Sequence, residues 1–257
     1  MNLNNTFYER DLLIKRSPNF EEDHQYIVMG DKTYTSVTEL CERFFEEFNA
    51  DQIIGKFYKR WQSNRHHKYY EMSKTQIKEF WEKEKTNGAK RGSIFHSNIE
   101  DNFKEIESLE KPDPELWQGF LNFLEDHPGI KPQRLEWAIF DEDFKVAGSL
   151  DALMSYNGKL ILLDWKQNKN ITQQGFNGKK AKSPIQQLDH CDLTKYQIQI
   201  NIYRHILESK YDIPISAQDI VWFNASHQRG YRKFETPRLE TEIKSVLECN
   251  RIKNLEL

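Results

Sequence analysis

The Asn-Gly dipeptide at residues 157–158 constrains the fold of this chain more than any other short segment. It separates two mostly apolar runs, FKVAGSLDALMSY (144–156) and KLILLDWKQ (159–167). Asn-Gly between two such runs is the strongest short-range signal for a two-residue β-hairpin turn. Counting outward from the turn pairs Asp151 with Asp164, which would make the two carboxylates direct cross-strand neighbours, about 5 Å apart at Cβ.

The repulsion between two acids in this position must be offset, because like charges opposite each other destabilise a half-buried sheet. A shared proton, an arginine or a divalent cation could each relieve the repulsion. Lys166 lies on the same strand face as Asp164, but one ammonium beside two carboxylates leaves a net negative charge. A divalent cation, Mg²⁺ or Mn²⁺, accounts best for the two aspartates and the lysine, since both ions bind hard oxygen ligands.

A D-x-K tripeptide alone does not establish a metal site, so a simpler interpretation of Asp164 and Lys166 stays open. Asp164 and Lys166 would then be ordinary polar residues at the end of a strand. The hairpin register that brings in Asp151 favours the metal site. In that site the carboxylates would hold the ion, and the lysine would position a water or offset charge that develops in the transition state.

Four sequence blocks follow one another in a characteristic order. They are RGSIFHSNIE (91–100), VAGSLDAL (146–153), LLDWKQ (162–167) and YQIQINIYRHIL (196–207). Together they resemble the PD-(D/E)XK nucleases, and among them the RecB-like exonuclease branch, which includes the mitochondrial genome maintenance exonucleases and, more distantly, lambda exonuclease. Each block alone is a weak signal, but four in order at the expected intervals are a strong one.

The resemblance implies a role for residues in each block. In the helical G-x-x-x-H block, the histidine would be an additional metal ligand. The aspartates of the G-x-x-D and (D/E)-x-K strands would hold the ion, and the lysine would help to activate water. The glutamine and tyrosine of the Q-x-x-x-Y helix would shape the substrate side. In chain order these residues are His96, Asp151, Asp164, Lys166, Gln199 and Tyr203.

Glu136, in RLEWAIF (134–140), stands where such nucleases often have an upstream strand acid, and we include it among the catalytic candidates. The length of the loop to the next strand decides on which face of the sheet the Glu136 side chain lies. An even-numbered loop can set Glu136 opposite Ser149, on the Asp151 face of the sheet. An odd-numbered loop would turn it to the other face, because a slip of one residue inverts a strand.

The helical candidates also have structural interpretations. His96 has apolar neighbours on its helix and would otherwise be a half-buried histidine or a partner of Glu100. Tyr203 belongs to an apolar stripe and would otherwise be a core residue. Gln199 beside that stripe needs hydrogen-bond partners, which a substrate phosphate or an active-site carboxylate would provide.

The net charge of −3 does not indicate a nucleic-acid-binding protein, but the charges are unevenly distributed. Residues 56–70 (KFYKRWQSNRHHKYY) and 165–186 each carry five Lys or Arg and no acid. A solvated surface is one interpretation of both segments. In the other, the cations contact DNA phosphates while aromatic side chains stack on unpaired bases. The candidate nucleic-acid-binding residues are Lys56, Lys59, Arg60, Trp61, Arg65, Lys68, Lys179, Lys180 and Lys182.

Composition excludes several other classes. The chain is 37% hydrophobic with a mean hydropathy of −0.83, and no stretch approaches the ~20 apolar residues of a membrane helix. We therefore expect a soluble, intracellular protein without a membrane partner, and nothing indicates which proteins it binds. Its three scattered cysteines indicate neither disulfides nor a zinc site, and they cannot supply the four-cysteine iron–sulfur cluster of some RecB-like proteins.

The predicted fold class is α/β. We expect a restriction-endonuclease-like core, with a mixed central β-sheet flanked by helices, and a helical N-terminal region. Residues 1–89 would form an N-terminal hairpin and a helical DNA-guiding region, and residues 90–257 the nuclease core, with both parts in one compact unit. Both faces of the strand at 160–165 are apolar, which predicts helices on both faces of the sheet. We expect a hairpin at 26–35, helices at 37–50, 73–88, 90–108, 114–126 and 193–211, and further strands at 219–226 and 231–236. Capping boxes at 36–39 (SVTE) and 73–76 (SKTQ) mark the starts of the first two helices.

The sequence thus predicts a Mg²⁺- or Mn²⁺-dependent DNA nuclease, an exonuclease that acts on single-stranded ends. Two alternatives stay open. One is an endonuclease of the same fold that cleaves duplex DNA or RNA, and the other is a non-catalytic nucleic-acid-binding module.

Overall fold

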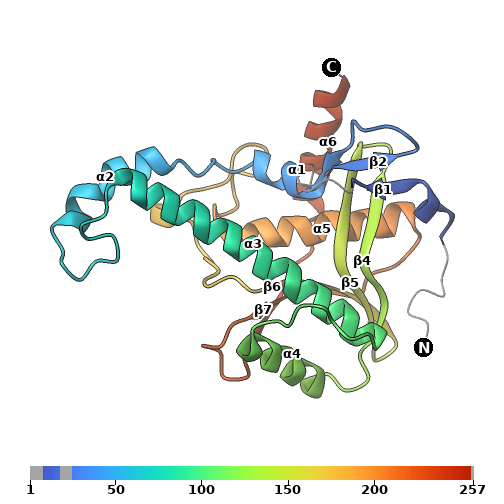
Figure 1. Cartoon of the computed structure of the whole chain (residues 1–257). Coiled ribbons are helices and arrows are strands. Elements are labelled where there is room, and N and C mark those ends of the chain that lie inside the picture. Colours follow the sequence, from blue (N-terminus) through green and yellow to red (C-terminus); the bar gives the residue numbers. More distant parts are fainter. Residues whose placement is uncertain (1–7, 18–24, 256–257) are drawn as a thin grey trace. The chain divides into compact units, whose positions relative to one another are not determined.

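The computed structural model describes residues 8–17 and 25–255 of the chain (Figure 1). Its contacts divide the chain into two units, Glu47–Ile94 and a larger unit made of the residues up to Glu46 and from Phe95 onward. The helices are α1 (Val37–Arg43), α2 (Ala50–Gln62), α3 (Lys74–Lys104), α4 (Pro114–Asp126), α5 (Asp192–Lys210) and α6 (Glu240–Leu255), with 3-10 turns η1 (Glu9–Leu12) and η3 (Phe176–Gly178).

A mixed six-stranded sheet forms the centre of the larger unit, as the sequence predicts. Its strands run in the order β3-β5-β6-β7-β8, and β4 pairs with β5. The β3–β5 and β6–β7 pairs are parallel, and the other pairs are antiparallel. The strands are β3 (Thr35–Ser36), β4 (Lys131–Asp141), β5 (Val146–Tyr156), β6 (Lys159–Lys166), β7 (Ala217–Phe223) and β8 (Tyr231–Glu235), and a separate small sheet pairs β1 (Ile14–Arg16) with β2 (Tyr26–Val28).

The predicted Asn-Gly turn joins β5 to β6. Asn157 has a φ of 50° and Gly158 a φ of 73°, the left-handed values that a two-residue hairpin turn of this kind requires. Tyr156 pairs with Lys159 as the arithmetic predicts, and the ladder continues in the same register until Ala152 pairs with Leu163. It ends there, one step before Asp151 and Asp164.

Strand β5 changes its neighbour along one edge. Strand β4 pairs with it from Val146 to Ser155, whereas β3 pairs only with Val146 and Ala147 and β6 only from Ala152 onward. Because β4 occupies one edge throughout, β3 and β6 share the other edge and leave residues 148–151 there without a strand partner. A Cβ atom on Gly148 would lie 2.7 Å from Cε1 of Tyr203 on α5, so this close contact requires glycine.

Helices cover both faces of the sheet, as predicted. On one face, α1, α5 and α6 pack against Leu150 and Leu153 of β5 and Leu162 of β6. On the other face, α4 and the part of α3 from Phe95 onward pack against β5, β6 and β7. The side chain of Trp165 belongs to this second core, among the rings of Phe120, Phe123 and Phe223. No helix among the described residues is long and apolar enough to cross a membrane.

The smaller unit, residues 47–94, has its own core. Ile54, Tyr69 and Ile77 are buried there, with Tyr58, Trp61, Met72 and Trp81 packed around them. Asn49 caps α2, and Ser73 and Gln76 form the reciprocal pair of hydrogen bonds that the predicted capping box requires before α3.

Several predicted elements are wrong. Residues 26–35 do not form a hairpin, because β2 pairs with β1 and only an isolated bridge joins Val28 to Asp31. The helix expected at 37–50 ends at Arg43, and α2 begins separately at Ala50. The two helices expected on either side of Gly88 are one continuous helix, α3, because glycine weakens a helix without breaking it when its neighbours are good helix formers.

The smaller unit begins at Glu47 and ends at Ile94, whereas the predicted boundary lies between residues 89 and 90. The β1–β2 pair belongs to the larger unit, since Ile14, Tyr26 and Val28 share a core with Phe140 and Ala147 of the sheet.

The contact between Gly148 and Tyr203 can be tested by substitution. Gly148→Ala should lower the free energy of unfolding by about 1–3 kcal/mol, because the new methyl overpacks a buried site. Gly55→Ala is the matched control: its added Cβ meets nothing within 4 Å, and alanine should be neutral or stabilise α2 by about 0.5–1 kcal/mol. Chemical denaturation measures both, and equal stability of the two variants would contradict the packing argument.

Candidate metal centre

Three side chains from three elements meet beside the break in the β5 ladder. They are His96 of α3, Glu136 of β4 and Asp151 of β5, and one ligand atom of each lies within 4.8 Å of the others. Nδ1 of His96 is 3.2 Å from Oε1 of Glu136 and 3.8 Å from Oδ1 of Asp151. Each side chain is only partly exposed, so the cluster is half-buried.

Glu136 reaches the cluster because the turn between β4 and β5 is even-numbered, as one of the two alternatives requires. Ala138, not Glu136, pairs with Ser149, so the predicted partner is wrong by two residues. The same register places Glu136 across from Asp151. Its φ of 45° lies in the left-handed region, which a glutamate inside a strand rarely adopts. Such strained residues concentrate at functional sites.

The peptide groups of Trp165 hold two members of the cluster. Its N–H donates to Oδ2 of Asp151 over 2.7 Å, and its carbonyl oxygen lies 3.1 Å from Nε2 of His96. When Nε2–H donates to that carbonyl, Nδ1 is the nitrogen that faces the carboxylates. This arrangement, in which one histidine nitrogen is held by a carbonyl, is typical of metal-binding histidines.

Charge favours a protonated imidazole at His96. Burial lowers the pKa of His96, but the carboxylates of Asp151 and Glu136 outweigh it and raise the pKa to about 9. Glu100, the alternative partner considered from the sequence, instead forms an ion pair with Lys104.

Asp164 and Lys166 form an ion pair next to the cluster. Nζ of Lys166 is 2.6 Å from Oδ2 of Asp164, which is 2% exposed. Burial raises the pKa of Asp164 to about 6, with the Asp151 carboxylate adding to this and Lys166 opposing it. The Asp164 and Asp151 carboxylates in turn outweigh burial and raise the pKa of Lys166. Oδ1 of Asp164 is buried and has no hydrogen-bond partner among the described residues.

The sequence interpretation missed one contact of Lys166. Its Nζ lies 4.8 Å from the ring centroid of Tyr196 on α5, within the range of a cation–π interaction. Tyr196 is the first residue of the 196–207 block, but that block implies roles only for Gln199 and Tyr203. The signal that could have found it is its position one turn before Gln199. His96 comes from a helix on one face of the sheet and Tyr196 from a helix on the other.

Gln199 and Tyr203 contact each other rather than the carboxylates. Nε2 of Gln199 donates to the hydroxyl of Tyr203 over 3.4 Å. Tyr203 is buried in the α5 core and fits against the bare backbone of Gly148. This geometry suits the core interpretation of Tyr203, and its catalytic role stays a prediction.

Two of the three lysines predicted to bind nucleic acid in the larger unit have acidic partners. Lys179 forms an ion pair with Glu46, and Lys180 with Asp189. Lys182 is exposed. The structure therefore gives less support to a DNA-binding role for Lys179 and Lys180 than for Lys182.

Comparison with known proteins adds little to this geometry. No protein-family model matches the chain, and no curated protein matches it. Among solved structures, SSO0001 is similar over 87% of this chain and 77% of its own, with 14% identity and a TM-score of 0.38. A Eubacterium rectale protein named "Putative exonuclease" is similar over 87% of this chain and 79% of its own, with 12% identity and a TM-score of 0.34. At TM-scores this low, neither likeness decides the function, and the resemblance to PD-(D/E)XK nucleases stays a prediction.

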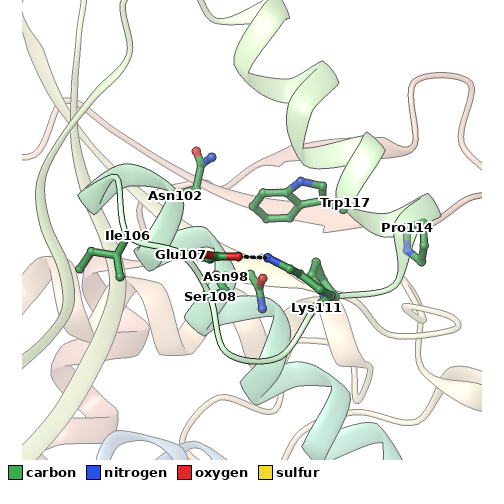
Figure 2. Close-up of a pocket in the computed structure, with 9 residues that line it drawn as sticks. Asn98, Asn102, Ile106, Glu107, Ser108, Lys111, Pro114 and Trp117 are labelled. Carbon is green, nitrogen blue, oxygen red and sulfur yellow. Dashed lines mark ion pairs between the residues drawn. The ribbon is translucent and has the colours of Figure 1, made fainter.

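A cleft of about 350 Å³ lies elsewhere on the larger unit (Figure 2). Trp117 of α4, Asn98 and Asn102 of α3 and the intervening loop line it. Nδ2 of Asn98 donates to the Glu110 carbonyl, and Lys111 pairs with Glu107. None of the candidate site residues named from the sequence lines this cleft.

The electrostatics of His96 lead to a prediction for the metal-free protein. NMR of chelator-treated protein should show the His96 imidazole titrating near pH 9. Glu136→Gln should lower that pKa, because it replaces a hydrogen-bonded carboxylate with a neutral amide. Glu100→Gln, one turn along α3, should leave it unchanged.

The same shift predicts a stability effect. Because the folded-state pKa is raised, the stabilisation from protonated His96 is complete below about pH 6.5 and is lost as the pH rises through about 9. Unfolding measured across this window should show less pH dependence in Glu136→Gln than in wild type. An unchanged His96 titration in that variant would contradict the assigned contact.

Proposed function

We propose that this chain is a metal-dependent nuclease that hydrolyses phosphodiester bonds, and that it acts as an exonuclease on single-stranded DNA ends. The observation that carries the proposal is the convergence of His96, Glu136 and Asp151, within 4.8 Å of one another, beside the buried Asp164–Lys166 pair. The ordered sequence blocks support the same reaction class.

The donor set fits a divalent cation. Two or three carboxylates with one imidazole suit Mn²⁺ and, with fewer protein ligands, Mg²⁺. The buried Oδ1 of Asp164, which lacks a hydrogen-bond partner among the described residues, is a further atom that a cation would satisfy. We assign His96, Glu136 and Asp151 as the ligands, with Asp164 completing the set.

When bound, such an ion polarises a phosphoryl oxygen and lowers the pKa of water. The chain's own residues supply the rest. The Trp165 peptide orients His96 and Asp151 through its two hydrogen bonds. Lys166, held by Asp164 and placed over the Tyr196 ring, presents a fixed positive charge that can position the attacking water or stabilise charge on the phosphate.

Cleavage of an end-labelled single-stranded oligonucleotide tests the reaction. With Mn²⁺ or Mg²⁺ present, Asp151→Asn and Lys166→Met should each lower the rate by about 100-fold or more, the usual cost of removing a group that stabilises transition-state charge. Asp219→Asn is the matched control, because Asp219 is also a buried aspartate of this sheet, paired with Lys233. It should keep wild-type activity.

Substrate form separates the alternatives in the same assay. Opening of circular single-stranded DNA would identify an endonuclease, and preferred cleavage of RNA would change the substrate class. Wild-type protein that binds oligonucleotides and yields no metal-dependent product would be the non-catalytic module.

Metal binding has its own readout. Mn²⁺ is titrated into chelator-treated protein and its binding is followed by electron paramagnetic resonance. His96→Ala and Glu136→Gln should each bind Mn²⁺ at least about tenfold more weakly than wild type, because even the loss of a residue that only hydrogen-bonds a metal ligand costs about tenfold or more in affinity. Asp219→Asn should bind as wild type does. Equal Mn²⁺ affinity in wild type and all three variants would contradict the assignment of His96 and Glu136 as ligands.

A further inference from the structure

Four aromatic residues of the unit 47–94 belong to its own core, namely Tyr58, Trp61, Tyr69 and Trp81. Phe48 and Phe80 of the same unit are 69% and 38% exposed. The Trp61 ring is stacked with Phe57 and with His67, at interplanar angles of 22° and 9°. Its other ring contacts are edge-on, with Tyr69 and Trp81. Nε1 of Trp81 donates to the Tyr69 hydroxyl over 2.6 Å. A unit this small needs these rings to bury enough apolar surface, which leaves Trp61 poorly placed to stack on a base.

The cations of the same unit are exposed instead. Between residues 56 and 74 there are six Lys or Arg and one acid, Glu71. Lys56, Lys59 and Arg60 follow the i, i+3, i+4 spacing, so they form one stripe along α2. That stripe lies opposite the side of α2 that carries Ile54 and Tyr58 into the core. In the part of the chain that the structure describes, none of the six forms an ion pair; they are Lys56, Lys59, Arg60, Arg65, Lys68 and Lys74.

The loop that follows α2 is held in place by Gln62. Its Nε2 donates to the carbonyls of Tyr69 and Met72, and its Oε1 accepts the N–H of Glu71. Arg65 and Lys68 therefore extend from a loop whose backbone is pinned. A pinned loop lowers the entropy lost when its cations engage a partner.

We propose that the unit 47–94 binds single-stranded DNA through its phosphates and not through its bases. The proposal deepens the proposed nuclease function, because it names how the substrate would be held. The partner follows from charge complementarity: exposed cations without an acidic partner among the described residues match a regularly charged backbone. Because the aromatic rings that lie among these cations are buried or half-buried, we expect the binding to carry no preference among bases.

Fluorescence anisotropy on the full chain tests this, with labelled oligo-dT and oligo-dA of equal length as probes. A chelator in the buffer prevents cleavage, so binding is measured apart from any catalysis. We expect equal affinity for the two probes. If all six cations neutralise phosphates, log K should fall with log[salt] at a slope of about −4, at roughly −0.7 per contact.

The triple variant Lys56→Gln, Lys59→Gln, Arg60→Gln should reduce the steepness of that slope by about 2 and weaken binding by about tenfold or more. The control, Lys32→Gln, Lys159→Gln, Lys253→Gln, removes the same charge from exposed lysines outside the unit and should bind as wild type does. All substituted side chains are exposed, and circular dichroism checks that both variants stay folded.

Three results would overturn the inference: equal weakening in the two triple variants, an unchanged slope in the first, or a strong preference for one homopolymer, which would indicate base stacking. Loss of cleavage activity is a separate matter. A wild-type chain that binds as described but cleaves nothing with Mn²⁺ would contradict the proposed nuclease function and leave this inference intact.

Discussion

Strand β5 keeps β4 along one edge from Val146 to Ser155, but on its other edge it exchanges β3 for β6. The candidate centre depends on this exchange. Between the two partners, residues 148–151 have no neighbouring strand on that edge, so Tyr203 can approach Gly148 and a side chain can replace a backbone group in the hydrogen-bonding pattern. Asp151 does so when it accepts the Trp165 N–H. An uninterrupted β5–β6 ladder would have used that N–H for pairing.

The electrostatics follow from the same break. Three carboxylates, an imidazole and an ammonium lie together where burial penalises charge, and each charge is tolerated only because an opposite one is close. Asp151 and Glu136 raise the pKa of His96, and Asp164 raises that of Lys166. The result is a half-buried group of acids that is only partly neutralised by the chain itself. A cation would complete the compensation that His96 and Lys166 begin.

The sequence predicted the parts of this structure that local chemistry determines. The Asn-Gly turn set the β5–β6 register, and the capping residues Ser36 and Ser73 marked two helix starts. It could not predict where the ladder ends, because the same edge of β5 is contacted by residues far away in the chain. Strand β3, more than a hundred residues earlier, pairs with Val146 and Ala147, and Tyr203 lies against Gly148. For the same reason, the predicted cross-strand pair of Asp151 and Asp164 is not part of the ladder, which ends at Ala152 and Leu163. Asp151 lies with His96 and Glu136, while Asp164 binds Lys166. The tertiary role of Tyr196 and the continuity of α3 through Gly88 likewise lay beyond local patterns.

Trp165 combines two roles that are usually found in different residues. Its indole fills the core between Phe120, Phe123 and Phe223, while its peptide groups orient Asp151 and His96. No exchange of side chain removes a peptide N–H, other than replacement by proline, and no exchange at all removes the carbonyl. Apart from the proline variant, a deep mutational scan of this chain would therefore classify position 165 by abundance, and the part that its backbone takes in organising the centre would leave no separate mark in such data.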